Sequence, residues 1–215
     1  TSGVRLLDKT IEERFSEKEN YVTVMSSPNA WRWHLNADVI RETTKLMGKD
    51  IADFGCNHGA CTILMAEYGK KVVGFDLNEE ALKVARETLK EHPSDVRKNL
   101  SFKQSFFHNL DSEDNAFDGG YMIDVFEHLF PEDRKVIFDE IKRVMRENSR
   151  IVIVTPYEDS CDHHSHVDYF NEEKFKEVLE GLGLYIINVA RDQRTDMKNE
   201  EHNRLNALCV VNKTN

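Results

Sequence analysis

The sequence predicts an α/β fold, a doubly wound and mostly parallel sheet with helices on both faces. Apolar runs of strand length alternate along the chain with stretches of helical periodicity, which is the pattern of strands joined by covering helices. The first apolar run ends in a glycine-punctuated turn, and the second ends in a carboxylate. We expect strands near residues 50–54, 71–76, 100–104, 119–123, 150–155, 185–191 and 206–211. Asn78 is the expected cap of the helix that follows Asp76, and Pro131 is expected in the first turn of a later helix.

The first predicted strand runs directly into its turn, as Asp50-Ile-Ala-Asp-Phe-Gly-Cys-Asn-His-Gly59. Gly55 and Gly59 remove the side chains that would block a ligand where a parallel strand feeds a helix. Asn57 stands between them, and asparagine is the non-glycine residue that best tolerates a left-handed backbone. We therefore expect the turn to form with Asn57 in place of a middle glycine.

The second predicted strand, Lys71-Lys-Val-Val-Gly-Phe-Asp76, ends in an acid. An acidic side chain at this point of an α/β fold accepts hydrogen bonds from a ribose diol. The ends of the first two strands face one crevice. Together they predict a nucleotide-like cofactor.

Four motifs in order resemble the class I S-adenosylmethionine-dependent methyltransferase superfamily. Asp53-Phe-Gly55-Cys-Asn57-His-Gly59 is similar to the family's acid followed by Gly-x-Gly-x-Gly, and Asp76 is the second motif. The third and fourth are Phe117-Asp-Gly-Gly-Tyr-Met-Ile-Asp124-Val-Phe-Glu127-His128-Leu129 and Arg150-Ile-Val-Ile-Val-Thr-Pro156. Within the superfamily, the chain resembles the small-molecule type, which carries Glu-His-Leu after its fourth strand.

The resemblance implies a Rossmann-like sheet of seven strands, with an antiparallel last strand inserted at the sheet edge. It covers roughly residues 37 to 212. We expect one methyltransferase domain over residues 1–215, with a lid segment at 1–36 and the Rossmann-like core at 37–212. A chain of this length buries about 70% of its unfolded surface, which is enough for one core.

S-adenosylmethionine is the cofactor that the resemblance implies. Asp53 would support the turn or the cofactor's amine, Asp76 would hold the ribose, and Leu77 would lie beside the adenine. Phe106 either stacks on the adenine or belongs to the core. The implied cofactor-binding residues are Asp53, Gly55, Cys56, Asn57, Gly59, Asp76, Leu77, Asn78, Ser105, Phe106, Phe107 and Ile123.

His128 and Asp124 are the candidate catalytic residues. The sulfonium already activates the methyl group, so positioning contributes most of the catalysis and a base matters chiefly for hydroxyl or protonated amine acceptors. His128 follows the fourth strand, and imidazole titrates near neutral pH. The alternative is a histidine that only hydrogen-bonds the neighbouring loop.

A metal site is a second interpretation of the same region. If residues 124–128 turn helically, Asp124, Glu127 and His128 fall on one face, and His166 lies in a later run of histidines and acids. Carboxylates and imidazoles suit magnesium, manganese or iron. The arrangement resembles ubiquinone-biosynthesis O-methyltransferases and small-RNA 3′-terminal 2′-O-methyltransferases, which share acid-x-x-Glu-His and a later histidine. The alternative is a solvated loop beside an enzyme that uses no metal.

Aromatic side chains indicate where the acceptor binds. The lid segment carries Tyr21, Trp31, Trp33 and His34, which either wall a pocket for a planar or sugar-like acceptor or pack the lid on the sheet. Tyr157 and His166 would form the opposite wall.

Composition limits the partners. With 29 Lys+Arg and 39 Asp+Glu, the formal charge is −10, which disfavours nucleic acid and anionic lipid. The sequence shows no signal peptide and no long apolar run, so no membrane partner is expected. The 4 cysteines lack Cys-x-x-Cys spacing, which predicts a reducing, cytoplasmic compartment. No coiled-coil heptad indicates an oligomeric state.

The patterns favour transfer of a methyl group from S-adenosylmethionine to an oxygen or nitrogen of a small molecule. One alternative is a metal-assisted RNA 3′-terminal 2′-O-methyltransferase, for which a basic groove is expected. Another is a catalytically silent S-adenosylmethionine-binding module. A nicotinamide-dependent oxidoreductase fits poorly, because Gly55, Gly59 and Ala60 do not complete Gly-x-Gly-x-x-Gly.

Overall fold

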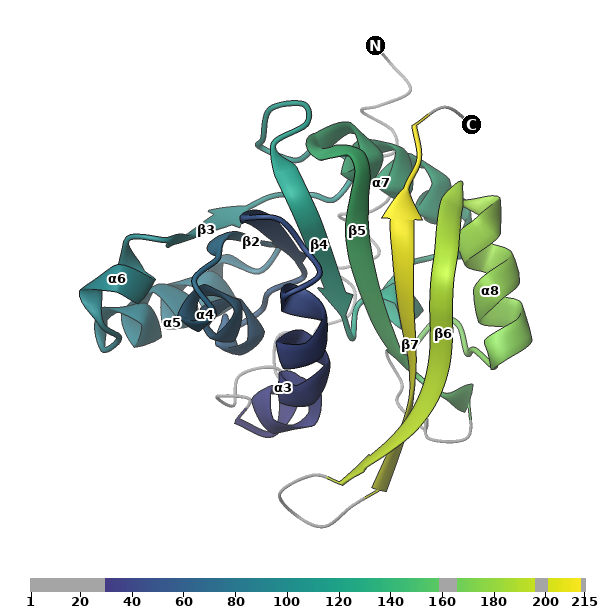
Figure 1. Ribbon diagram of the computed structural model, residues 1–215, viewed down its shortest axis with the longest axis horizontal. Coiled ribbons are helices and arrows are strands. Elements are labelled where there is room, and N and C mark those ends of the chain that lie inside the picture. Colours follow the sequence, from purple (N-terminus) through teal and green to yellow (C-terminus); the bar gives the residue numbers. More distant parts are fainter. Residues whose placement is uncertain (1–29, 159–165, 196–200, 214–215) are drawn as a thin grey trace.

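The computed structural model describes residues 30–158, 166–195 and 201–213, which build a seven-stranded sheet with helices on both faces (Figure 1). The strands are β1 (Asp50–Phe54), β2 (Lys71–Asp76), β3 (Leu100–Gln104), β4 (Phe117–Ile123), β5 (Met145–Pro156), β6 (Leu184–Thr195) and β7 (Glu201–Val211). The helices are α3 (Ala30–Thr44), α4 (Ala60–Glu67), α5 (Glu79–Lys90), α6 (Ser94–Arg97), α7 (Pro131–Val144) and α8 (Glu172–Gly181), with a 3₁₀ turn η1 (Phe126–His128).

The strand order is β3-β2-β1-β4-β5-β7-β6. The pairs β3–β2, β2–β1, β1–β4 and β4–β5 are parallel, whereas β7 pairs antiparallel with both β5 and β6. The predicted seven-stranded mixed sheet is therefore confirmed. The antiparallel strand lies one position inside the edge, because it is inserted between β5 and β6.

The predicted strand bounds are right for β1, β2 and β3 but too short for the other four strands. β6 and β7 continue as an antiparallel hairpin as far as the Thr195–Glu201 pair. The residues of this extension are mostly polar, so they carry no apolar alternation that a sequence pattern would detect. The structure adds residues 117–118, 145–149, 156, 184, 192–195 and 201–205 to the predicted strands.

Local sequence signals set the helix starts. The side chain of Asn78 accepts hydrogen bonds from the N–H groups of Glu80 and Ala81, so the predicted cap of α5 is confirmed. Pro131 is the first residue of α7, as predicted.

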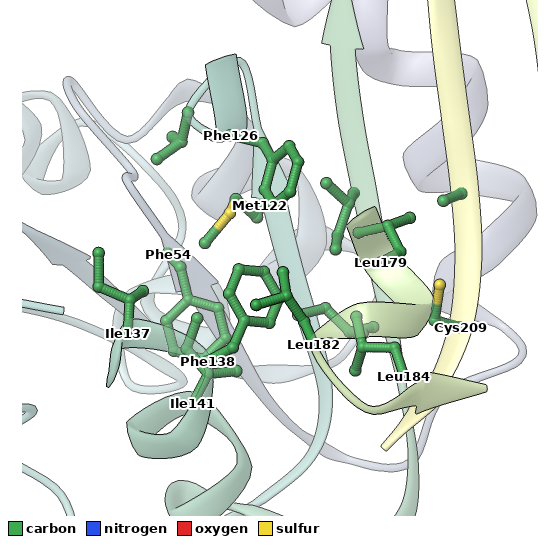
Figure 2. Close-up of a cluster of buried hydrophobic side chains, with 14 of the residues drawn as sticks. Phe54, Met122, Phe126, Ile137, Phe138, Ile141, Leu179, Leu182, Leu184 and Cys209 are labelled. Carbon is green, nitrogen blue, oxygen red and sulfur yellow. The ribbon is translucent and has the colours of Figure 1, made fainter. Parts of the chain in front are cut away.

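Two apolar clusters fill the spaces on either side of the sheet. Side chains of α7 and α8 pack on one face, with Phe138 and Leu179 among them (Figure 2). Side chains of α3, α4 and α5 pack on the other face. Neighbouring residues of β4 alternate between the two layers, since Met122 joins the first cluster and Tyr121 the second. No helix within the described ranges has the length and apolar character needed to span a bilayer.

Tyr121 joins the end of α3 to the middle of the sheet. Its hydroxyl lies 2.8 Å from the hydroxyls of Thr43 and Thr44. Burial raises the pKa of the Tyr121 phenol to about 12. The contact therefore fixes the end of α3 just before the chain enters β1.

Replacing Tyr121 with phenylalanine removes this hydroxyl and leaves the buried Thr44 side chain with one partner fewer. We expect the Tyr121→Phe variant to lose about 1–3 kcal/mol of unfolding free energy in urea. The matched control is Tyr185→Phe, because Tyr185 is 68% exposed. The control should change stability by less than about 0.5 kcal/mol, and equal losses in both variants would contradict the prediction.

Candidate active site

The loop after β1 adopts the left-handed turn that the sequence predicts. The backbone φ angles are +87° at Gly55, +49° at Asn57 and +79° at Gly59, which confirms that Asn57 takes the place of a middle glycine. A Cβ atom on Gly55 would lie 2.2 Å from the Val125 side chain, and one on Gly59 would lie 2.5 Å from the Phe102 ring. Protein side chains, not an open space for a ligand, therefore occupy the positions beside these two glycines.

Asp76 ties this loop to the end of β2. One carboxylate oxygen accepts the Asn57 N–H at 2.8 Å, and the other accepts the Asn78 N–H at 2.8 Å. The N–H groups of Gly55 and Cys56 bond the carbonyl of Phe75 in the same strand. Asp76 therefore holds the loop after β1 next to the end of β2, and its role as a ribose acceptor stays a prediction.

A small hollow with a cavity volume of about 30 Å³ lies beside the loop and opens to solvent. Burial raises the pKa of Asp53 to about 7, although its carboxylate accepts a 2.6 Å hydrogen bond from Thr62. Burial likewise raises the pKa of the Cys56 thiol, which lies against Gly74. The hollow is lined by Asp53, Gly55, Cys56, Asn57, His58, Ala60, Cys61 and Ile123.

The predicted adenine contacts lie on the loop after β3. The N–H of Ser105 bonds the carbonyl of Asp76, so this loop lies next to the end of β2. Phe107 packs on the cluster that α7 covers, whereas the half-buried Phe106 ring lies 5.5 Å from the His108 ring. Phe107 therefore contributes to the core, and an adenine contact by Phe106 stays a prediction. Leu77 and Asn78 are half-buried beside the same strand end.

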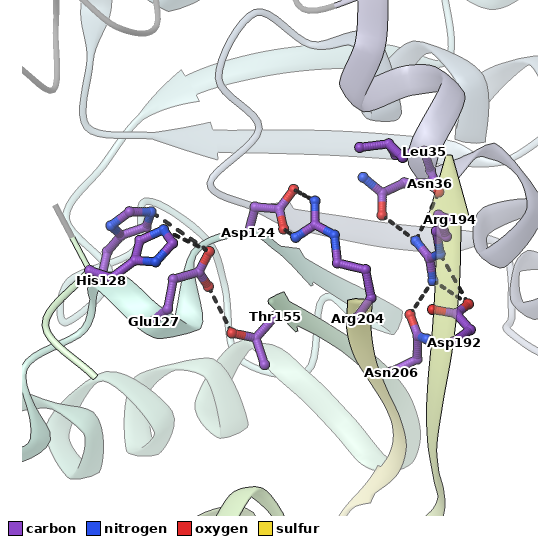
Figure 3. Close-up of polar contacts among 11 residues, drawn as sticks. Leu35, Asn36, Asp124, Glu127, His128, Thr155, Asp192, Arg194, Arg204 and Asn206 are labelled. Carbon is purple, nitrogen blue, oxygen red and sulfur yellow. Dashed lines mark hydrogen bonds and ion pairs between the residues drawn. The ribbon is translucent and has the colours of Figure 1, made fainter. Parts of the chain in front are cut away.

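Asp124 follows β4 with a left-handed backbone at φ +55° and forms a buried ion pair with Arg204 of β7 (Figure 3). A second contact joins Arg204 Nη2 to the other carboxylate oxygen at 3.1 Å. The 3₁₀ turn begins only at Phe126. The condition for a shared face, a helical turn over residues 124–128, is therefore not met, and Asp124 does not share a helical face with Glu127 and His128.

Glu127, His128 and His166 come together beyond this point. Glu127 Oε1 lies 3.7 Å from His128 Nε2 and 3.9 Å from His166 Nε2. One donor atom from each residue lies within 4.8 Å of the other two. Thr155 donates a 3.1 Å hydrogen bond to Glu127, whose pKa rises to about 8 through burial and the nearby Asp124 charge. Three of the four predicted metal ligands are thus neighbours, and Asp124 is outside the group.

The other predicted acceptor residues are only partly described. The Tyr157 ring lies 3.8 Å from the guanidinium carbon of Arg191, and its N–H bonds the carbonyl of Asn203. Tyr21 lies outside the described residues, as do the side chains of Trp31, Trp33 and His34.

Arg194 fastens α3 to the hairpin of β6 and β7. Its guanidinium donates to the carbonyl of Leu35 at 2.9 Å and to the Asn36 side chain at 2.8 Å. It also binds Asp192 and Asn206 (Figure 3). The predicted boundary between lid and core, after residue 36, therefore falls inside a helix that is fixed to the sheet. The lid role of residues 1–36 stays a prediction.

Known proteins resemble this chain in sequence and in fold. Residues 52–153 match the family model of a methyltransferase domain. The chain is 30% identical over 114 residues to a ubiquinone biosynthesis O-methyltransferase of Idiomarina loihiensis, which covers 53% of this chain and 44% of that protein. A demethylmenaquinone methyltransferase of Lactococcus lactis is 28% identical over 165 residues, covering 71% of this chain and 61% of that protein.

A solved structure of an S-adenosylmethionine-dependent methyltransferase from Aquifex aeolicus has a TM-score of 0.70 at 18% identity, covering 89% of this chain and 97% of that one. The chain is therefore similar to methyltransferases over residues 52–153, and it shares the fold of a solved S-adenosylmethionine-dependent methyltransferase. It spans less than half the length of the ubiquinone-biosynthesis relatives that it matches.

Sequence reasoning missed two residues of this candidate site. Thr155 was visible in the Thr-Pro end of the fifth-strand motif, although no role followed from it. Arg204 lies in the part of β7 that apolar alternation did not detect, 80 residues from its partner Asp124. A lone arginine beside a predicted apolar strand is the only sequence signal for that ion pair.

Asp53 should make the stability of the fold fall as the pH rises. Its pKa is near 3.8 in an unfolded chain and about 7 in the folded protein. Between these values the folded state keeps the proton that the unfolded chain has lost, so stability decreases with pH. The unfolding free energy of the wild type relative to Asp53→Asn should fall by up to about 1.4 kcal/mol per pH unit.

Urea unfolding from pH 4 to pH 8 measures this difference. Asp139→Asn on the exposed face of α7 is the control, because hydrogen bonds from Lys135 and Lys142 outweigh burial and lower the pKa of Asp139. The unfolding free energy of the wild type relative to Asp139→Asn should not fall between pH 4 and pH 8. The prediction is wrong if the unfolding free energy of the wild type relative to Asp53→Asn also stays constant with pH.

Proposed function

We propose that this protein transfers a methyl group from S-adenosylmethionine to an oxygen or nitrogen of a small-molecule acceptor. The observation that carries the proposal is the Asp76 carboxylate, which binds the N–H groups of Asn57 and Asn78 beside the hollow. The names of the relatives, which act in ubiquinone and menaquinone biosynthesis, support a small acceptor.

The cofactor would bind at the hollow, next to the carboxyl groups of Asp53 and Asp76. Asp76 would accept hydrogen bonds from the ribose hydroxyls, because an acid at the end of the second strand of such a fold lies beside the ribose. Asp53 lies buried in the wall of the hollow, where burial favours its protonated form. The ammonium group of the cofactor's methionine part would favour the ionised form, so binding would lower the pKa of this carboxyl.

A divalent metal fits between Glu127, His128 and His166. The donors are one carboxylate and two imidazoles, a set that suits iron, manganese or zinc. Donor atoms that share one such metal lie about 3.0–3.5 Å apart, for bonds near 2.1 Å. The observed separations from Glu127 Oε1 are 3.7 Å and 3.9 Å, and all three donor atoms lie within 4.8 Å of one another, so the three side chains would have to draw together to share one ion. When bound, the metal would polarise or orient an acceptor hydroxyl.

In the transfer step, the acceptor atom bonds the methyl carbon as the carbon–sulfur bond breaks, and the sulfur leaves as a neutral thioether. A hydroxyl acceptor must also lose its proton. Asp124 is poorly suited to accept it, because the Arg204 guanidinium binds both carboxylate oxygens. His128 is then the proposed base in the metal-free protein, whereas a metal-bound His128 would act as a ligand.

Asp76→Asn tests the cofactor site. The variant replaces a charged acceptor with a neutral amide, and the loss of charge-assisted hydrogen bonds should weaken S-adenosylmethionine binding about 10–100-fold in calorimetry. Asp95→Asn, on the exposed surface of α6, is the matched control and should bind as the wild type does. Thermal unfolding shows that both variants are folded. Unchanged affinity in Asp76→Asn would overturn the ribose role.

Methyl-labelled S-adenosylmethionine tests the activity. The chelator-treated protein is incubated with a cell extract, with and without Mn²⁺, and label is counted in the small-metabolite and RNA fractions. We expect metabolite labelling, reduced about 10²-fold or more in His128→Ala while cofactor affinity is kept. Dependence on Mn²⁺ would support the metal, and equal labelling without it would support His128 as the base.

Two outcomes would overturn the proposal. Label in RNA alone would favour the metal-assisted RNA 3′-terminal 2′-O-methyltransferase, against which the charge of −10 argues. Binding of S-adenosylmethionine with no label in either fraction would favour a silent cofactor-binding module.

A further inference from the structure

We propose that Arg134 and Asp168 are positioning residues that hold the His166 segment against Glu127. The inference rests on the proposed metal site for its chemical purpose. The contacts that support it belong to α7, α8 and residues 166–170, which lie outside the cofactor hollow.

Backbone hydrogen bonds attach the segment to η1. The carbonyl of Glu127 accepts the N–H of Val167 at 2.9 Å and that of Asp168 at 3.3 Å. These bonds bring His166, the residue before Val167, next to the turn that carries Glu127 and His128. The imidazoles of His128 and His166 are 4.9 Å apart between ring centroids.

Arg134 connects α7 both to η1 and to the segment that carries His166. Its guanidinium bonds the Asp168 carboxylate at 2.7 Å, and the two side chains are only 4% and 13% exposed. The same guanidinium lies 5.0 Å from the ring centroid of Phe126 and 5.2 Å from that of Phe170. Phe126 precedes Glu127 in η1, and Phe170 ends the segment. Arg134 therefore contacts η1 and the His166 segment at once.

Lys174 adds a contact from α8. Its ammonium binds the Asp168 carboxylate and donates to the carbonyl of Tyr169 at 2.9 Å. The N–H of Tyr169 also donates to Asp168, at 2.9 Å. The Asp168 carboxylate thus joins two helices to the segment two residues after His166. Since a partly buried carboxylate needs these donors, their positions determine where the segment lies.

The consequence is that His166 is kept close enough to Glu127 and His128 for the three donor atoms to lie within 4.8 Å of one another. Residues that orient metal ligands typically change metal affinity by about 10–100-fold when they are mutated. Asp168→Asn keeps the side-chain shape and removes the charge. Arg134→Lys keeps the charge and loses the planar guanidinium that donates to Asp168 and lies over the rings of Phe126 and Phe170.

Mn²⁺ binding to the full chain, measured by calorimetry, is the first test. We expect about 10–100-fold weaker binding in Asp168→Asn and in Arg134→Lys, with S-adenosylmethionine affinity unchanged. Arg143→Lys is the matched control, because Arg143 lies on the same helix and pairs with Glu140 and Asp114. Its Mn²⁺ affinity should equal that of the wild type. Thermal unfolding identifies any variant that does not fold, and Arg134→Lys is the milder change.

Amide hydrogen exchange at Val167 and Asp168 is the second test, and it needs no metal. In the metal-free protein, exchange at these two amides should be at least about tenfold faster in Asp168→Asn than in the wild type, with Arg143→Lys unchanged. Equal exchange in all three proteins would overturn the positioning role. Faster exchange with unchanged Mn²⁺ affinity would overturn its link to the metal.

The two tests separate this inference from the proposed metal. A wild type that binds no Mn²⁺ would overturn the metal site itself. Faster exchange in Asp168→Asn would still support Arg134 and Asp168 as the residues that hold the segment against Glu127.

Discussion

The buried ion pair between Asp124 and Arg204 fixes the direction in which the chain leaves β4. A charge in this position is stable only when it is paired, and Arg204 supplies the partner from β7. The left-handed Asp124 also donates its N–H to the carbonyl of Val154, which anchors the turn to β5. The chain then continues into η1, where Glu127 accepts a hydrogen bond from Thr155, whereas the Asp124 carboxylate is bound by Arg204 (Figure 3).

The end of β4 separates two parts of the proposed active site. Ile123 is its last residue and lines the hollow, which the loop after β1 otherwise encloses. Glu127 lies four residues later, in a group that also contains His128 and His166. Cofactor and acceptor would therefore meet across a short stretch of backbone. The positions of both parts depend on the same strand end, which makes Asp124 and Arg204 structurally important even without a direct chemical role.

The sequence predicted the parts of the fold that follow local rules. The left-handed Asn57, the Asn78 cap and Pro131 at the start of α7 were all confirmed, because a turn, a helix cap and a first helical turn depend on a few neighbouring residues. The bounds of the first three strands were right because their apolar runs are short and end in clear turns. The longer hairpin of β6 and β7 was missed since its ends are polar.

For the candidate site, the sequence by itself determined which residue types stand at the strand ends, and it found Glu127, His128 and His166. Only the tertiary structure decided how they combine. It paired Asp124 with an arginine 80 residues away and excluded it from the metal group. It also brought Arg134 to Asp168, which are 34 residues apart. Such pairs form because a buried charge takes whatever partner the packed sheet and helices bring within reach, and sequence spacing does not contain that distance.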